Sequence, residues 1–291
     1  MQSTAAAVTM VRDDTTFLAA WLRHYGRLLG RENCTVVNHG HGTAVARLAE
    51  GCNVIGIPGD PHPNFDVKRW RLLNNLVQGL RPYYDHVIVG DVDEIVVRDP
   101  IHGETLLEFL ARMPGKRVLT PVGLEVIHRR AEEPAPIEDG VLGRRRHVRP
   151  APHYAKPCII STGTKIARGG HFAQADTLHV PEGLYLLHLK YADFDTYVSA
   201  QDRRNAMTAA LGVGVREAAV GRHWFAQARK DDAALFDRLD ALPLREGFDL
   251  GWLRDEMRAS WRPRGTTGFW EFDRPDHKLR YRLPERFDGL F

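Results

Sequence analysis

The chain has 291 residues, 43% of them hydrophobic, and its 40 basic residues nearly balance 37 acidic ones, for a formal net charge of +3. This balance gives no overall electrostatic reason to expect nucleic acid as a partner, and the apolar content is ample for a core. Three widely spaced cysteines exclude a disulfide framework and a zinc knuckle. No charged leader and no apolar run of about 18 residues occurs. We therefore expect a soluble, cytoplasmic protein without a transmembrane segment, for which peripheral membrane contact stays open.

The first ninety residues alternate between strand and helix patterns. Helical spacing of large apolar side chains predicts helices, and short β-branched runs predict strands. In chain order the pattern gives a strand at 7–11, a helix at 17–28, a strand at 34–38, a helix at 45–50, a strand at 53–57 and a helix at 66–80. Three successive strand-helix units predict a parallel, doubly wound α/β sheet with right-handed crossovers.

The next strand, beginning at His86, stops at three acidic residues within four positions, Asp91, Asp93 and Glu94. Ligands bind at the carboxyl ends of strands in open α/β sheets, and carboxylates gathered there repel one another unless a cation offsets their charge. Mg²⁺ and Mn²⁺ prefer oxygen ligands and commonly bridge to phosphate. We interpret this stretch as a metal-assisted site for a nucleotide diphosphate. The alternative is that these acids only cap the element that follows.

The second half of the pattern holds a helix at 105–112 and strands at 117–121, 124–128, 158–161 and 185–189. Glu125 interrupts an apolar strand, where it is either a general base for an acceptor hydroxyl or an edge-strand residue facing water. Residues 129–152 carry four prolines and an arginine cluster at 144–146 and Arg149. This composition predicts a long loop or lid whose arginines either clamp an anion or remain solvated.

Several stretches, taken in order, resemble nucleotide-sugar glycosyltransferases of family 2 and their relatives. Residues 8–14 and the following helix look like the opening of these enzymes, and Val89–Glu94 is similar to their Asp-x-Asp-Glu metal motif. The stretches at 154–157, 169–172 and 184–190 resemble, in order, the second half of such bacterial enzymes. The resemblance spans about residues 7–197. It implies a GT-A type α/β fold with a mostly parallel central sheet, flanking helices and a helical C-terminal portion.

The resemblance implies a metal-dependent, inverting hexosyltransferase. Such an enzyme moves a sugar from a nucleotide diphosphate sugar, foremost a UDP-sugar, to a carbohydrate or other hydroxyl acceptor. Its implied role is in surface polysaccharide or glycoconjugate synthesis. Where the family often has an acid for the uracil base, this chain has Asn38 and His39. We assign donor binding to Val11, Arg12, Asn38, Lys68, Asp91 and Lys156. We assign Mn²⁺ or Mg²⁺ to Asp91 and Asp93, completed by His188 or His171, although each histidine could instead be a satisfied core residue. The candidate bases are Glu125 and Asp176.

We expect a transferase core at 1–197, with a donor half to about residue 100 and an acceptor half beyond it. A helical extension at 198–291, with helices at 206–210, 216–228 and 233–242, would pack on this core. Two other functions stay open. A nucleotidyltransferase would use the same metal chemistry, although Arg12-Asp13-Asp14 stands where a glycine- and lysine-rich phosphate loop would be expected. A noncatalytic carbohydrate-binding protein would not need the acidic cluster.

Overall fold

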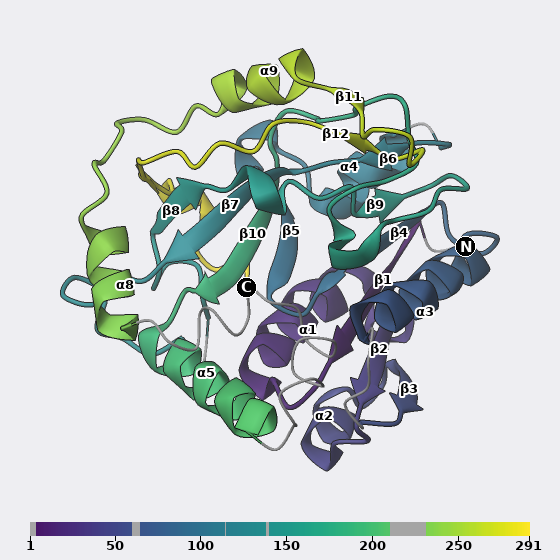
Figure 1. The fold of residues 1–291 in the computed structure, drawn as a ribbon, viewed down its shortest axis with the longest axis horizontal. Coiled ribbons are helices and arrows are strands. Elements are labelled where there is room, and N and C mark those ends of the chain that lie inside the picture. Colours follow the sequence, from purple (N-terminus) through teal and green to yellow (C-terminus); the bar gives the residue numbers. More distant parts are fainter. Residues whose placement is uncertain (1–3, 60–64, 114, 138–139, 210–230) are drawn as a thin grey trace.

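The structure is a computed structural model that describes residues 4–59, 65–113, 115–137, 140–209 and 231–291. Two sheets form its centre, with helices around them (Figure 1). The expected helix at 216–228 lies outside the described residues. Within the described part of the chain, no helix is long and apolar enough to cross a membrane.

The first sheet has six strands and confirms the predicted α/β architecture. Its strand order is β3-β2-β1-β4-β9-β6, in which β1 to β4 run parallel and β9 runs antiparallel to both of its neighbours. The strands are β1 (Ala5–Val11), β2 (Cys34–His39), β3 (Asn53–Ile57), β4 (His86–Asp91), β6 (Val118–Leu119) and β9 (Ile159–Ile160). Every residue of β1 and β2 is buried, as their apolar runs predict.

Helices α1 (Thr15–Leu29), α2 (Thr43–Leu48) and α3 (Phe65–Leu80) connect the parallel strands. Asp14 caps α1 by accepting a hydrogen bond from the Phe17 amide at 3.2 Å. The buried stripe of α1 packs with the second sheet in one apolar cluster, whereas α3 packs in another cluster against residues of β1 and β4. The first sheet is therefore covered on both faces, which explains why its inner strands are apolar throughout.

The second sheet has the order β13-β8-β7-β10-β5, with β7 and β10 parallel and the other neighbours antiparallel. Its strands are β5 (Glu94–Arg98), β7 (Val122–Ile127), β8 (His147–Pro150), β10 (Leu184–Tyr191) and β13 (Tyr281–Arg282). Helix α4 (Leu106–Arg112) follows β5 and begins with a capping box between Thr105 and Glu108. Short 3-10 turns lie at Arg31–Asn33, Pro100–His102, Pro152–Tyr154, Arg168–Gly170 and Glu285–Phe287.

The C-terminal part contains α5 (Phe194–Ala209), α8 (Asp232–Asp240), α9 (Gly251–Ala259) and a small hairpin of β11 (Arg262–Pro263) and β12 (Trp270–Glu271). It is helical as expected, but it also supplies β13 to the second sheet. Phe287 and Phe291 are buried in the same apolar cluster as α1. These last residues complete the core, and a division of the chain at residue 197 stays a prediction.

The arginine cluster of the expected lid differs most from its prediction. Arg145 is only 1% exposed, and its guanidinium lies 2.8 Å from an Asp193 oxygen and donates to the carbonyls of Glu133 and Ala135. Arg146 pairs with Asp288 near the C-terminus. A solvated or clamping role is therefore wrong for Arg145, because its charge holds segments of the core together.

Candidate functional site

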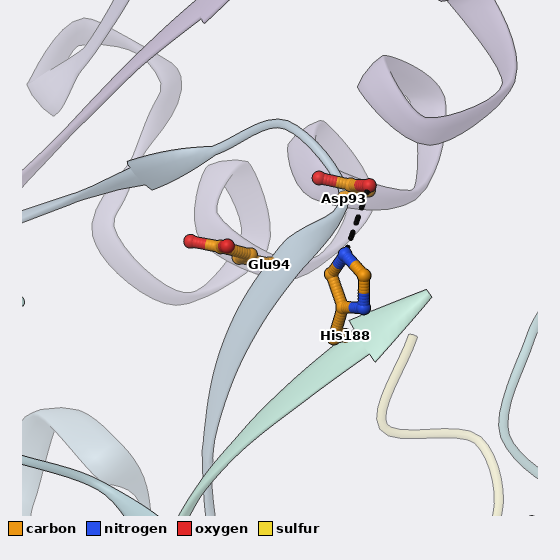
Figure 2. A group of neighbouring side chains, drawn as sticks. All are labelled: Asp93, Glu94 and His188. Carbon is orange, nitrogen blue, oxygen red and sulfur yellow. Dashed lines mark ion pairs between the residues drawn. The ribbon is translucent and has the colours of Figure 1, made fainter. Parts of the chain in front are cut away.

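The acidic stretch lies where the two sheets meet. β4 ends at Asp91 in the first sheet and β5 begins at Glu94 in the second, so the two residues between them cross from one sheet to the other. In the second sheet, Glu94 is directly opposite His188 of β10. Figure 2 shows the His188 ring reaching from β10 toward Asp93, beside Glu94. The junction thus gathers side chains that are far apart in the sequence at the carboxyl end of β4.

His188 lies between two carboxylates. Its Nε2 is 3.3 Å from Asp93 Oδ2 and its Nδ1 is 3.1 Å from Glu125 Oε1. The residue is 4% exposed, and its ring stacks on that of Tyr154, with ring centroids 3.6 Å apart. Burial by itself would lower the pKa of His188, but the attraction of Asp93 and Glu125 outweighs burial and raises that pKa above its ordinary value. Both nitrogens therefore have a partner, and the protonated ring is favoured.

Glu125 is a buried residue of an inner strand. It is 2% exposed on β7, which lies between β8 and β10, so the expectation of an edge-strand glutamate facing water is wrong. The Arg149 Nε and Nη2 groups lie 2.6 Å and 2.5 Å from Glu125 Oε2. Burial alone would raise the pKa of Glu125, but His188 and Arg149 together lower it. The carboxylate is thus ionised, with both oxygens engaged.

Asp93 has a more open position at the turn between β4 and β5. Its side chain is 20% exposed, against 5% for that of His188. Burial opposes ionisation of Asp93, but His188, Lys156 and Arg204 outweigh it and lower the pKa of Asp93. Asp14 lies close enough for Asp93 to contribute to its raised pKa of about 6, of which burial is the main cause. Asp93 is therefore a partly accessible carboxylate that stays charged near neutral pH.

Two cations hold Asp91. The Lys156 Nζ is 3.3 Å from Asp91 Oδ2 and 2.5 Å from Glu94 Oε1, and Arg69 of α3 pairs with the other oxygen of Asp91. Lys156 is 3% exposed, so its charge is directed at these two carboxylates rather than at bulk water. The repulsion expected between Asp91 and Glu94 is thus already offset by side chains of the protein itself.

One group of side chains in the described part of the chain has the composition of a metal site. Ligand atoms of Asp93, Glu94 and His188 all lie within 4.8 Å of one another. Two ligands at right angles on a cation with bonds of about 2.1 Å lie about 3 Å apart, and the 3.3 Å between Asp93 and His188 is close to that value. Carboxylate oxygen suits Mg²⁺ and Mn²⁺, whereas imidazole nitrogen is more typical of Zn²⁺ and iron. Asp93 and His188 fit a cation best, since Lys156 already pairs with Glu94.

The other residues assigned to the donor lie near this junction without joining the group. Val11 is opposite Asn38 at the ends of β1 and β2, and Met10 is opposite Asp91, so all these residues share one edge of the first sheet. The Asn38 amide exchanges hydrogen bonds with the Gly42 backbone, and Arg12 donates to the Gly59 carbonyl at 2.6 Å. Lys68 is exposed on α3. The donor assignments themselves stay predictions.

His171 and Asp176 are placed outside the group. The His171 ring N–H donates from Nδ1 to the His153 carbonyl at 2.8 Å, and burial together with Lys156 and Arg274 lowers the pKa of His171 to about 3. Asp176 is exposed, and its carboxylate accepts a hydrogen bond from the neighbouring Thr177. Of the two histidines proposed for the metal, the structure brings only His188 next to Asp93.

Four contributors were not assigned a role from the sequence: Glu94 as a ligand, and Arg69, Arg149 and Tyr154 as partners. Glu94 follows Asp93 directly, so its position was visible, but its contact with Lys156 was not. The sequence groups Arg149 with a basic cluster that either clamps an anion or remains solvated, whereas the structure pairs it with Glu125. Its pairing with Glu125 follows from the register of β7 and β8, in which these two residues are opposite each other.

The sequence matches no family model and no curated protein. One of the solved structures similar to it is the crystal structure of mannose-1-phosphate geranyltransferase from Thermus thermophilus, at 12% identity and a TM-score of 0.30. The match covers 96% of this chain and 74% of that chain. A similarity this low indicates no function for this chain.

Proposed function

We propose that this protein is a metal-dependent glycosyltransferase that moves a sugar from a nucleotide diphosphate sugar to a hydroxyl acceptor. The observation that carries the proposal is the convergence of Asp93 and His188 from two sheets, with Glu125 behind the imidazole. Metal-bound histidines commonly donate their second ring N–H to a carboxylate, which fixes the tautomer and the ring orientation. Glu125 is placed to accept that hydrogen, which would leave His188 Nε2 for a cation shared with Asp93.

Asp93 and His188, with Glu94 beside them, would hold Mn²⁺ or Mg²⁺. When bound, the cation supplies stabilisation of the negative charge on a leaving diphosphate. Lys156 and Arg69 add positive charge next to this position through their pairs with Asp91. Asp91 would then orient the ribose or a water molecule, and the two cations would favour phosphate oxygens at the open side of the site.

The proposed role of Glu125 changes with its surroundings. A base must reach the acceptor hydroxyl, but both Glu125 oxygens are engaged by His188 and Arg149 and the residue is buried. We therefore propose Glu125 as a positioning residue for His188. The exposed Asp176 remains the candidate for the base that an inverting transfer requires.

Donor hydrolysis tests this function without knowledge of the acceptor. The protein is incubated with a panel of nucleotide sugars and Mn²⁺ in water, and release of nucleoside diphosphate is measured. Asp93→Asn and His188→Ala should abolish release, whereas Asp255→Asn, at an exposed position on α9, should not. Pyrophosphate release from a nucleoside triphosphate and a sugar phosphate would instead indicate a nucleotidyltransferase. Sugar binding that survives Asp93→Asn, with no turnover of any donor, would indicate a noncatalytic binding protein.

Calorimetry tests the metal separately. Nucleoside diphosphate is titrated into the protein with and without Mn²⁺. The proposal expects markedly tighter binding with the metal in the wild type, and no such gain in Asp93→Asn. Equal affinities in both conditions for the wild type would contradict a shared site for metal and diphosphate.

A further inference from the structure

A cavity of about 670 Å³ lies between α1, α2 and the 3-10 turn at Arg31–Asn33. Its lining includes four arginines and a single acid, namely Arg23, Arg27, Arg31, Arg47 and Glu50. We call these arginines and the space between them the arginine groove. Four guanidinium groups against one carboxylate give its walls a strong positive charge.

The arginine groove lies at the opposite edge of the first sheet from Asp93. α1 begins just after the carboxyl end of β1 and runs back along the sheet, so its last turn reaches the edge where β2 begins (Figure 1). Fifteen helical residues span about 22 Å at 1.5 Å per residue. Arg27 and Arg31 are at that far end. A ligand in the groove would therefore not share the proposed transfer site.

Two of the arginines lack an internal partner for their charge. Arg27 and Arg47 are exposed, and neither forms an ion pair with any residue that the structure describes. Cations placed together without an acid between them repel one another unless an anion or solvent offsets their charge. Elsewhere on this protein exposed arginines pair with acids, as Arg112 does with Glu104. The groove thus presents positive charge that the protein itself does not neutralise.

Arg31 is held in place at the groove. Its guanidinium donates to the Leu48 carbonyl at the end of α2. Its stem lies across Gly26, where an added Cβ would be 3.2 Å from the Arg31 Cγ. A guanidinium that is already ordered loses less conformational entropy on binding and offers a planar fork that matches phosphate oxygens. Part of the groove is therefore preorganised.

We propose that the arginine groove binds a phosphate-bearing anion. Its volume of about 670 Å³ is within the range of roughly 300–1,000 Å³ typical of ligand sites, and it exceeds what a single inorganic phosphate needs. Arginine side chains recognise phosphate through paired, charge-assisted hydrogen bonds. The same chemistry is offered by phospholipid headgroups and by soluble polyphosphates. The inference does not depend on the reaction at Asp93.

The test uses the full chain and two probes. Cosedimentation is measured with vesicles of phosphatidylglycerol and phosphatidylcholine and with vesicles of phosphatidylcholine alone, and calorimetry is performed with inorganic tripolyphosphate. The Arg27→Glu/Arg47→Glu double variant reverses two exposed charges in the groove. The control is Arg238→Glu/Arg282→Glu, which reverses two exposed charges on α8 and β13 and gives the same net charge.

The expected result is at least a tenfold loss of affinity in the groove variant and less than a twofold change in the control. Binding to anionic vesicles alone would assign a lipid headgroup, and binding to tripolyphosphate would assign a soluble ligand. Equal losses in both variants would show only a general charge effect and would overturn the proposal. Wild-type protein that binds neither probe would also overturn it. Thermal melting confirms that both variants fold.

Discussion

Substitution of Glu125 by Gln is the sharpest test of the site, because it removes one charge while keeping the size of the side chain. In the wild type, Glu125 Oε1 is 3.1 Å from His188 Nδ1, and Oε2 accepts from Arg149. The variant amide can still accept from His188, but it no longer favours the protonated ring. We therefore expect the pKa of His188 to fall toward its ordinary value in the metal-free protein.

The size of the effect follows from burial. Breaking a buried ion pair costs about 3–5 kcal/mol of stability. The low end of this range applies here, because Arg149 would still have an ion-pair partner in Asp276, whose carboxylate is 3.3 Å away. A loss of roughly 3 kcal/mol corresponds to a melting temperature lower by roughly 6 °C, at about 2 °C per kcal/mol for a large domain. Loss of the carboxylate behind a metal-bound histidine typically weakens metal binding by about 10- to 100-fold. We expect about tenfold, since the amide preserves the tautomer.

The assay measures Mn²⁺ binding by electron paramagnetic resonance at pH 8 and titration of the His188 ring by NMR. Asp99→Asn is the matched control, because Asp99 is also buried and also accepts two hydrogen bonds from one arginine, at 2.6 Å and 2.9 Å from Arg286. The control should lose stability without losing metal affinity. If Glu125→Gln leaves both the Mn²⁺ affinity and the pKa of His188 unchanged, the positioning role is refuted.

Three further predictions concern stability. Burial lowers the pKa of His24 to about 4, so between pH 6.5 and 4 the unfolded chain binds a proton that the folded chain does not. The free energy of unfolding should therefore fall by up to roughly 3 kcal/mol as the pH drops over that range. Urea titrations at several pH values should show a weaker pH dependence of this free energy in His24→Gln. Gly123→Ala should lower the free energy of unfolding by about 3 kcal/mol or more, because the added Cβ would lie 2.3 Å from a backbone nitrogen. Gly79→Ala is the control, because its Cβ would meet open space. Thermal melting of the two variants makes the comparison. Arg145→Leu should cost about 3–5 kcal/mol, because the Asp193 carboxylate loses its charged partner. On the proposed function, donor hydrolysis per folded molecule should be unchanged.

The parts of the fold that sequence could predict depend on local patterns. The parallel strands and their helices follow from apolar runs and helical spacing, and α3 buries Trp70, Leu73 and Val77 as its stripe predicts. The acidic end of β4 was predictable for the same reason, because an apolar run that stops at carboxylates marks both a buried strand and its exposed end. These signals need no knowledge of distant partners.

The partners of the site were not predictable in this way. Arg149 meets Glu125 and His188 meets Glu94 only because β7, β8, β10 and β5 pair in one register, and a strand pattern does not reveal which strand lies next to it. The short strand β13 joins the same sheet from the far end of the chain. For Arg145 the local pattern itself is misleading. A run of three arginines is typical of a solvated segment, yet the middle arginine of this run is buried.

The charge balance of the junction indicates what its occupant must bring. Its inner ion-paired groups, none of them more than 29% exposed, are the carboxylates of Asp91, Asp93, Glu94 and Glu125 and the permanent cations Arg69, Lys156 and Arg149. The more exposed Asp66 and Asp276 pair with Arg69 and Arg149 from the solvent side, where water screens their charge. One negative charge remains, and a protonated His188 neutralises it. With a divalent cation in place of this proton, these inner groups would carry one excess positive charge in a partly buried site, where such an excess is costly. An anionic diphosphate would remove that cost, so on the proposed function metal and donor should each strengthen the binding of the other.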